Sequence, residues 1–181
     1  DQASDSYRKI RNTLRFLLSN LQDYSLESNL NALEKKIDTL PKTSMERYIL
    51  NKATRLQQQV QTAYQRYQFK QAHHALYDFC NDDLSSFYCS IVKDSLYCDE
   101  PSATRRQQIQ LTLHLLLEII IRLLGPILPH TAEEAYQALY NDNHALLPLV
   151  PSFKLSLETD ISYWEAIIQT RQTVLKELET A

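Results

Sequence analysis

The chain has 181 residues, of which 44% are hydrophobic, and its formal net charge is −3. That length allows one sizeable core, and the composition excludes a disordered chain. The single glycine, Gly125, excludes a P-loop and a Rossmann dinucleotide site, because both need several glycines for close backbone approach to phosphate. The negative net charge means that any nucleic-acid binding must come from a local basic patch.

The segment from Tyr7 to Leu21 predicts an amphipathic helix. At 100° per residue, its apolar side carries Tyr7, Ile10, Leu14, Leu17 and Leu21, and its polar side carries Arg8, Arg11, Asn12, Arg15 and Ser19. We expect no acid in this polar stripe, although basic residues on solvated helices usually have Glu or Asp four positions away. Two interpretations stay open: acids of another helix meet the stripe, or an anionic ligand does.

Further helices are expected along the chain. Residues 24–42 predict a short helical piece and a connector, and Met45 to Tyr67 predict a helix with Tyr67 on its apolar face. The stretch from Phe69 to Cys98 is helical in pattern, and "NDD" at 81–83 indicates a break or kink with Asp82 or Asp83 as an N-cap. Three capping boxes are predicted: Thr43 with Glu46, Thr131 with Glu134, and Ser162 with Glu165.

The run from Arg105 to Leu124 predicts a buried central helix, which Gly125 and Pro126 end. A membrane span is disfavoured, because a central charge costs about 2.5–3.5 kcal/mol on insertion scales. Residues 141–159 predict extended chain, and a last helix follows. The sequence therefore predicts an all-α fold, an antiparallel helical bundle over residues 1–142, with an extended connector and final helix over 143–181.

No constellation of residues indicates a catalytic centre or a metal site. His73 and His74 are adjacent and point in different directions on a helix, so they cannot share a metal ion. The three cysteines, nine residues apart, match neither zinc-ligand spacing nor a disulfide framework and indicate free thiols of a cytoplasmic protein. We expect no membrane partner. The chain begins without Met and stops inside a helical pattern, so we expect a piece of a longer protein.

Cationic and aromatic residues remain to be explained. Arginine or lysine beside exposed aromatic rings is the combination that holds phosphates and stacks unpaired RNA bases. For most of the tyrosines, such as Tyr88, core packing is the better interpretation. The candidate RNA-binding residues are Arg8, Arg11, Asn12, Arg15, Lys93, Tyr97, Arg105 and Arg106.

Several segments resemble, in the right order, the anticodon-binding domain of isoleucyl-tRNA synthetases, which are class I aminoacyl-tRNA synthetases. They are "SDSYRKIRNTLRFLLSNLQDY", "AYQRYQF", "FCNDDLSSFYCSIVKDSLYC", "RRQQIQLTLHLLLEIIIRLLGPILPHTAEEAY" and "RQTVLKELETA". The resemblance implies that the eight residues above face the anticodon stem-loop of an isoleucine tRNA. It also implies two further domains of the same parent chain: a catalytic domain that uses ATP and a C-terminal domain with a cysteine-rich zinc site. The sequence motifs of these two domains do not occur in the 181 residues.

Two alternatives remain at this point. The bundle could be a structural module whose arginine stripe docks onto acids of the catalytic domain without touching RNA. It could also be the equivalent domain of a valine or leucine enzyme, although the "YRKIRNTLRF" type of helix separates the isoleucine enzymes from these relatives.

Overall fold

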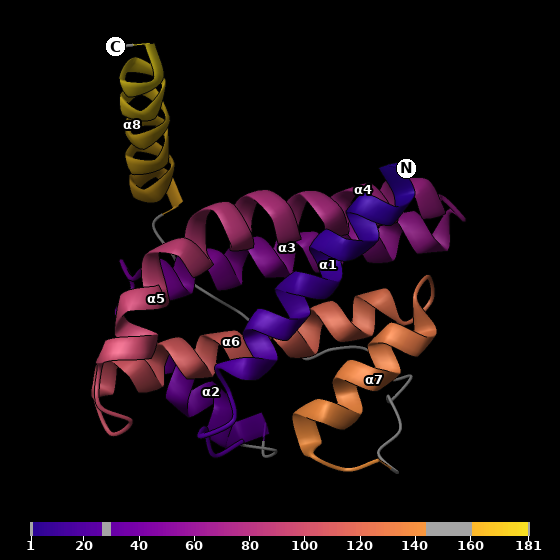
Figure 1. Cartoon of the computed structure of the whole chain (residues 1–181), viewed down its shortest axis with the longest axis horizontal. Helices are drawn as coiled ribbons and strands as arrows, with labels where there is room; N and C mark the ends of the chain where they lie inside the picture. The colour runs from indigo at the N-terminus through magenta and orange to yellow at the C-terminus, as the bar shows by residue number, and fades with distance from the viewer. Residues whose placement is uncertain (1, 27–29, 144–160, 181) are drawn as a thin grey trace.

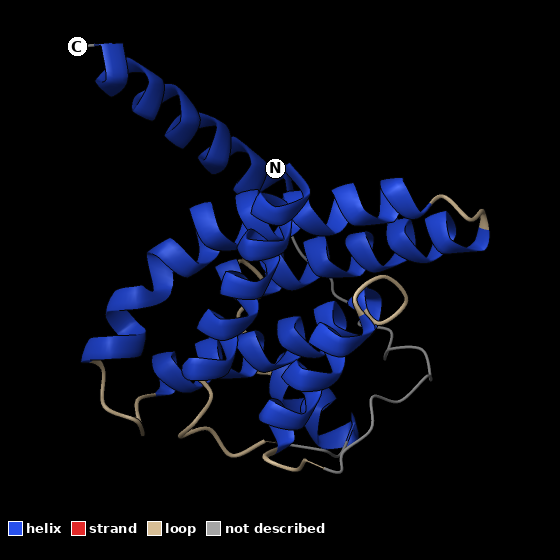
Figure 2. Ribbon diagram, turned by 45° about the vertical axis from the view of Figure 1, so that its right-hand side comes forward, coloured by secondary structure: helices blue, strands red, loops and turns tan. Residues whose placement is uncertain are grey.

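Helices make up all the regular secondary structure that a computed structural model describes over residues 2–26, 30–143 and 161–180 (Figures 1 and 2). The elements are α1 (Gln2–Ser19), α2 (Leu30–Asp38), α3 (Met45–Gln65), α4 (Phe69–Asp78), the π-helical segment η1 (Phe79–Tyr88), α5 (Cys89–Cys98), α6 (Thr104–Leu124), α7 (Pro129–Tyr140) and α8 (Ile161–Thr180). The predicted all-α fold is confirmed. The predicted extended connector lies almost wholly outside the described residues, and the predicted domain boundary at 142 stays a prediction.

The helix α6 lies at the centre of the molecule and carries most of the core. It packs against α1, α3, α5 and α7, and every residue from Ile109 to Ile121 is buried. By length and composition this helix could also cross a membrane, but 83% of its most apolar 18-residue window is buried inside the fold. The prediction of a buried central helix is confirmed. A helix that is apolar on nearly all sides is buried when other helices cover it all round.

The helices α3 and α4 form an antiparallel pair joined by a short turn (Figure 1). The turn contains Tyr67, whose φ is 56°, and the Gln68 N–H donates to the Ala63 carbonyl at 2.8 Å. α3 therefore ends at Gln65, two residues before the predicted end. The expectation that Tyr67 belongs to the buried face is wrong: its side chain is 82% exposed.

The chain stays helical from Phe69 to Cys98, so the predicted break at 81–83 is absent, but its hydrogen bonding changes to the π type over η1. Neither Asp82 nor Asp83 is an N-cap; the Lys52 ammonium bonds to Asp83 from α3. One buried residue occurs every four positions, namely Ala72, Leu76, Cys80, Leu84, Tyr88, Val92 and Leu96. A π turn holds more residues than the 3.6 of an α turn, so η1 keeps this four-residue stripe on one side.

The three predicted capping boxes are wrong. Ser44, rather than Thr43, caps α3 by accepting from the Arg47 N–H at 3.2 Å. Residue Thr131 is the third residue of α7, whose N-cap is Leu128 and has no side-chain capping bond. α8 begins at Ile161, so Ser162 lies within that helix. The short motif is a local signal, and in two of the three cases its acid, Glu46 or Glu134, is paired with an arginine of another helix.

The termini of two helices are fixed by long side chains. The buried Arg47 guanidinium donates to the carbonyls of Leu40 at 2.7 Å and Ile37 at 3.2 Å, which ties the end of α2 to the start of α3. The Trp164 indole N–H of α8 donates to the Thr43 carbonyl at 2.9 Å. α8 thereby begins against the bundle and then extends away from it (Figure 1).

Replacing Leu116 with alanine should test the central position of α6. Leu116 is fully buried, and large-to-small changes in a packed core cost about 2–5 kcal/mol of unfolding free energy. Urea unfolding followed by circular dichroism gives this value. The matched control is Ile91→Ala, because Ile91 is 45% exposed and its loss should cost far less. Equal unfolding midpoints for the two variants would contradict the central burial of α6.

The buried His114 on α6 should make folding pH-dependent. Neither ring nitrogen has a hydrogen-bond partner among the described residues, and burial lowers the pKa of the imidazole below its usual 6.5; Glu118 raises that pKa and Lys36 lowers it. Below pH 6.5, His114 therefore binds a proton more readily in the unfolded chain than in the folded chain. The free energy of unfolding falls as the pH falls.

The variant His114→Leu should remove this loss. Its unfolding free energy relative to the parent chain should rise by about 1 kcal/mol between pH 7.5 and pH 5.5. His74→Leu is the control, because His74 is exposed on α4. A relative stability of His114→Leu that does not change with pH would show that His114 titrates normally in the fold.

Candidate nucleic-acid interface

The outer face of α1 presents part of the predicted arginine stripe to solvent. Ile10, Leu14 and Leu17 are buried against the bundle, as their spacing predicts. Arg8, Asn12 and Arg15 are exposed on the opposite side, and we call these three residues the α1 surface. Asn12 and Arg15 have no hydrogen-bond or ion-pair partner within the described part of the chain. Two polar groups thus point outward from one helix with their bonding capacity unused.

Arg8 has a weak partner on its own helix. Its guanidinium lies 3.9 Å from the Asp5 carboxylate, and both side chains are more than two-thirds exposed. The expectation that no acid accompanies the stripe is therefore wrong at this position. Since exposed ion pairs are worth about 0–1 kcal/mol, Asp5 does little to hold Arg8, and the guanidinium stays accessible to an anion.

Arg11 is held by α7. Its two terminal nitrogens donate to the two carboxylate oxygens of Glu134, each at 2.8 Å, and one also donates to the Tyr7 hydroxyl at 3.3 Å. The hydrogen bond from Arg11 lowers the pKa of the Glu134 carboxyl. The Tyr7 hydroxyl in turn lies 3.3 Å from the Thr131 hydroxyl of α7. For Arg11, an acid from another helix meets the stripe, which is the first of the two interpretations.

Lys93 and Tyr97 lie on α5, one helical turn apart, and both side chains are exposed. Tyr97 is 66% exposed, whereas Tyr88, the residue directly before α5, is fully buried. Burial raises the pKa of Tyr88 well above its usual value. Core packing therefore explains Tyr88, and a cation next to an exposed ring remains at Lys93 and Tyr97.

Arg105 pairs with a buried acid. Its guanidinium lies 2.7 Å from the carboxylate of Glu46 on α3, which is only 1% exposed, and the Tyr88 hydroxyl also donates to that carboxylate at 3.3 Å. Burial alone would lower the pKa of Arg105, but the hydrogen bond and the charge of Glu46 outweigh this effect and raise it. Arg105 therefore compensates a charge inside the bundle.

Arg106 joins α6 to the turn that follows α1. Its guanidinium donates to the Asp23 carboxylate at 2.7 Å and to the Asp99 carbonyl at 3.0 Å. Two arginines in the first turn of α6 face an unfavourable helix dipole. Glu46 and Asp23 offset that cost, so the unusual placement that pointed to an external anion has an explanation within the fold.

The residues that sequence reasoning missed are the acids opposite these arginines, namely Glu46, Asp23 and Glu134. Each acid lies far from its arginine in the sequence. Glu46 is 59 positions from Arg105, Asp23 is 83 from Arg106, and Glu134 is 123 from Arg11. Helical periodicity assigns faces but not neighbours, so only information that links distant positions could have found these pairs.

Cysteines and histidines take structural positions in the described residues. Cys80 and Cys89 are buried, and burial raises the pKa of each thiol to about 12. The His73 imidazole lies 3.1 Å from the Ser6 hydroxyl. The described part of the chain brings together no group of three or more potential metal ligands.

Removing the Arg105 guanidinium should destabilise the fold, because it leaves the buried Glu46 carboxylate without its cation. We expect Arg105→Ala to lower the unfolding free energy by about 1–3 kcal/mol, a range that allows for the 43% exposure of Arg105. Urea unfolding checks this value. The double variant Arg105→Ala/Glu46→Gln should recover part of the loss, since a neutral amide needs no cation, and a fully additive double variant would contradict the pairing.

Comparison with known proteins assigns this chain to a family. The family model described as "Anticodon-binding domain of tRNA ligase" matches residues 46–181. Over 99% of its length, the chain is 37% identical to an isoleucine–tRNA ligase of Desulforudis audaxviator, 38% to one of Carboxydothermus hydrogenoformans and 35% to one of Lactococcus lactis. It spans about a fifth of each of these relatives, 19% of their length. The chain belongs to the family of anticodon-binding domains of tRNA ligases.

Proposed function

We propose that the α1 surface binds the anticodon arm of a tRNA, and that the chain does so as part of an isoleucine–tRNA ligase. The observation that carries this proposal is the pair Arg15 and Asn12, which lie exposed on α1 and have no partner among the described residues; the acid on this face, Asp5, lies 3.9 Å from Arg8. In a chain with net charge −3, such a face is a local basic patch of the kind that RNA binding requires.

The side chains divide the work by their chemistry. Arg8 and Arg15 can donate to phosphate oxygens, which position a nucleic acid but carry no sequence information. Asn12 lies between them on the same face, and its amide can donate to and accept from the edge of an unpaired base. Arg11 has its donors on Glu134, so its contribution to RNA binding would come from the plane of the guanidinium, on which a base can stack.

Lys93 and Tyr97 form a second place where RNA could be contacted. The exposed ring offers a stacking surface, and the ammonium four residues earlier offers a charge for the adjoining phosphate. Arg105 and Arg106, which the sequence also nominated, would have to leave Glu46 and Asp23 to reach an RNA. We therefore assign them a supporting role, in which they hold α6 in place beneath the binding surface.

Isoleucine specificity and catalysis concern the whole parent protein. We propose that the parent attaches isoleucine to its tRNA with ATP, since the similar proteins are isoleucine–tRNA ligases. In this proposal the adenylate-forming centre and any zinc site belong to parts of the parent other than this chain. Titration of the chain with isoleucine-tRNA and other anticodon stem-loops separates an isoleucine enzyme from a valine or leucine one.

Removing the Arg15 side chain should weaken RNA binding uniformly. If Arg15 holds a phosphate, Arg15→Ala should reduce affinity for cognate and non-cognate stem-loops by a similar factor. The slope of log affinity against log salt should become shallower by about 0.7–0.9. Fluorescence polarisation at several salt concentrations measures both quantities. A loss confined to the cognate stem-loop would instead make Arg15 a base reader.

The matched control is Arg55→Ala, which removes an exposed arginine from α3 and should leave affinity and salt slope unchanged. The structural alternative, in which the α1 surface docks onto another protein domain, predicts that Arg8→Ala, Asn12→Ala and Arg15→Ala all bind RNA as the parent chain does. That outcome would contradict the proposed function.

A further inference from the structure

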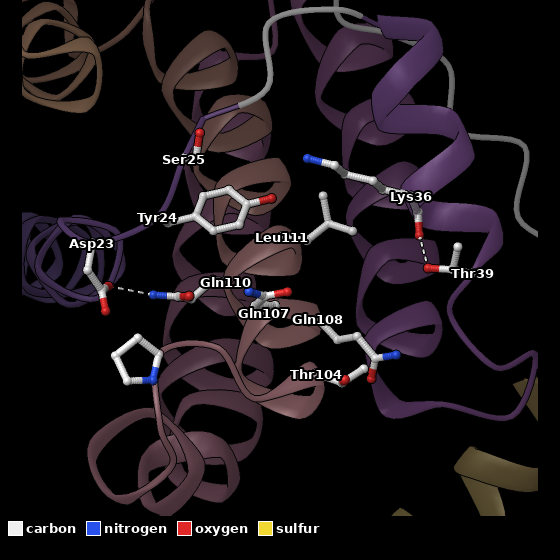
Figure 3. Close-up of a pocket in the computed structure, with 11 residues that line it drawn as sticks. Asp23, Tyr24, Ser25, Lys36, Thr39, Thr104, Gln107, Gln108, Gln110 and Leu111 are labelled. Carbon is white, nitrogen blue, oxygen red and sulfur yellow. Dashed lines mark hydrogen bonds between the residues drawn. The ribbon is translucent and has the colours of Figure 1, made fainter.

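A polar cavity of about 370 Å³ lies where the loop after α1, the helix α2 and the first turns of α6 meet (Figure 3). Tyr24 comes from the loop, Lys36 from α2, and Gln107, Gln108 and Leu111 from one face of α6. The volume lies within the range of about 300–1,000 Å³ that is usual for small-molecule pockets. None of the residues that the sequence nominated for RNA binding lines this cavity.

The cavity does not repel an anion. Asp23 is its only acid among the described lining residues, and its carboxylate accepts from the Arg106 guanidinium and from the Gln110 amide, each at 2.7 Å. Figure 3 shows Asp23 turned to Gln110, with the Lys36 ammonium on the other side of the cavity. With its acid paired to Arg106, the cavity is neutral to basic in character, which suits a phosphate-bearing ligand.

Two glutamines in the lining have amides to spare. Both N–H donors of the Gln110 amide are used, because the amide nitrogen donates to Asp23 and to the Asn20 carbonyl at 3.0 Å. The amides of Gln107 and Gln108 make no side-chain hydrogen bond to any residue that the structure describes. Each amide presents a donor beside an acceptor, and the Watson–Crick edge of every nucleobase does the same.

The remaining walls suit a flat ring. Tyr24 is half-buried, with its ring centroid 6.0 Å from that of His114, and Leu111 is buried on the neighbouring side. An aromatic ring and an aliphatic side chain together give a surface on which a base can stack, whatever its sequence. The cavity thus combines stacking, amide pairing and a nearby cation.

We propose that this cavity binds one unpaired base of the RNA that the α1 surface holds. The inference rests on the proposed function and deepens it by assigning a second contact. Asp23 and Tyr24 follow α1 after a single turn, and Arg15 lies one helical turn before the end of that helix. Because all four bases can pair with an amide, the cavity contributes affinity and fixes one nucleotide without strong sequence preference.

Two larger cavities are less suited to this ligand. One of about 610 Å³ beside α1 and α4 is lined by Lys70 and by two acids, Asp5 and Asp78, and has no side-chain amide among its described lining residues. Another, of about 520 Å³ between the ends of α1 and α7, is lined by aliphatic side chains, two tyrosines and the amides of Gln22 and Asn141, but by no cation among the described residues. Neither brings together unpaired amides, an aromatic wall and a cation among its described lining residues.

The test uses the 181-residue chain and isoleucine-tRNA anticodon stem-loops with 2-aminopurine at one unpaired loop position at a time. Binding should change the fluorescence strongly at one position, because the probe leaves the RNA stack for the cavity. In Gln107→Ala/Gln108→Ala this change should disappear, and affinity should fall about tenfold. The matched control, Gln58→Ala/Gln59→Ala on α3, removes two exposed amides elsewhere and should behave as the parent chain.

The isosteric variant Gln107→Glu/Gln108→Glu guards against loss of fold, since it keeps side-chain shape and should also lose the fluorescence change. If both cavity variants bind with unchanged affinity and an unchanged fluorescence pattern, the base-binding cavity is overturned while the proposed function stands. If the parent chain binds no stem-loop at all, both fall. An Arg15→Ala variant that binds weakly, yet shows the full fluorescence change at saturation, would support two separate contacts.

Discussion

The burial of α6 depends on partners for the polar groups that this helix carries into the core. The Glu118 carboxylate accepts from Arg122 one turn later, at 2.5 and 2.8 Å, and from the Tyr140 hydroxyl of α7 at 2.6 Å. At the other end, Gln110 and Arg106 bind Asp23. A buried ion costs several kcal/mol unless such bonds satisfy it, so the elements around α6 are placed as much by these bonds as by apolar packing.

The sequence predicted the faces of the helices well and their ends and neighbours poorly. The apolar spacing of α1, α3 and α6 marks residues that are buried in the fold, because periodicity reports burial directly. The capping boxes failed for an identifiable reason: Glu46 and Glu134, which would have closed two of them, bind Arg105 and Arg11 instead. The Glu46 carboxylate is buried and needs the charge of Arg105, whereas the exposed Glu134 bonds through both carboxylate oxygens to Arg11; each pair uses an acid that a local bond at a helix end would need.

The candidate binding residues divide by the same logic. Sequence reasoning grouped Arg11 and Arg15, which lack an acid at the favourable spacing on their own helix, with Arg105 and Arg106, which stand at a helix start where the dipole disfavours cations. The fold gives Arg11, Arg105 and Arg106 close partners from elsewhere in the chain, whereas Arg15 has none among the residues that the structure describes. The cavity beside Tyr24 could not be foreseen at all, since its walls come from three elements whose packing periodicity does not define.

The paired residues also explain how the free ones can act. On one side of α1, Arg11 grips Glu134 of α7; on the other, the Thr13 hydroxyl lies 3.1 Å from Ser85 and the Lys9 ammonium donates to Asn81 at 3.0 Å, both in η1. α1 is therefore held along two edges, and its outer face cannot rotate without breaking bonds on both. In the proposed function, a face fixed in this way would offer Asn12 and Arg15 to an RNA on a helix backbone that is already ordered, so only the side chains would have to be immobilised on binding.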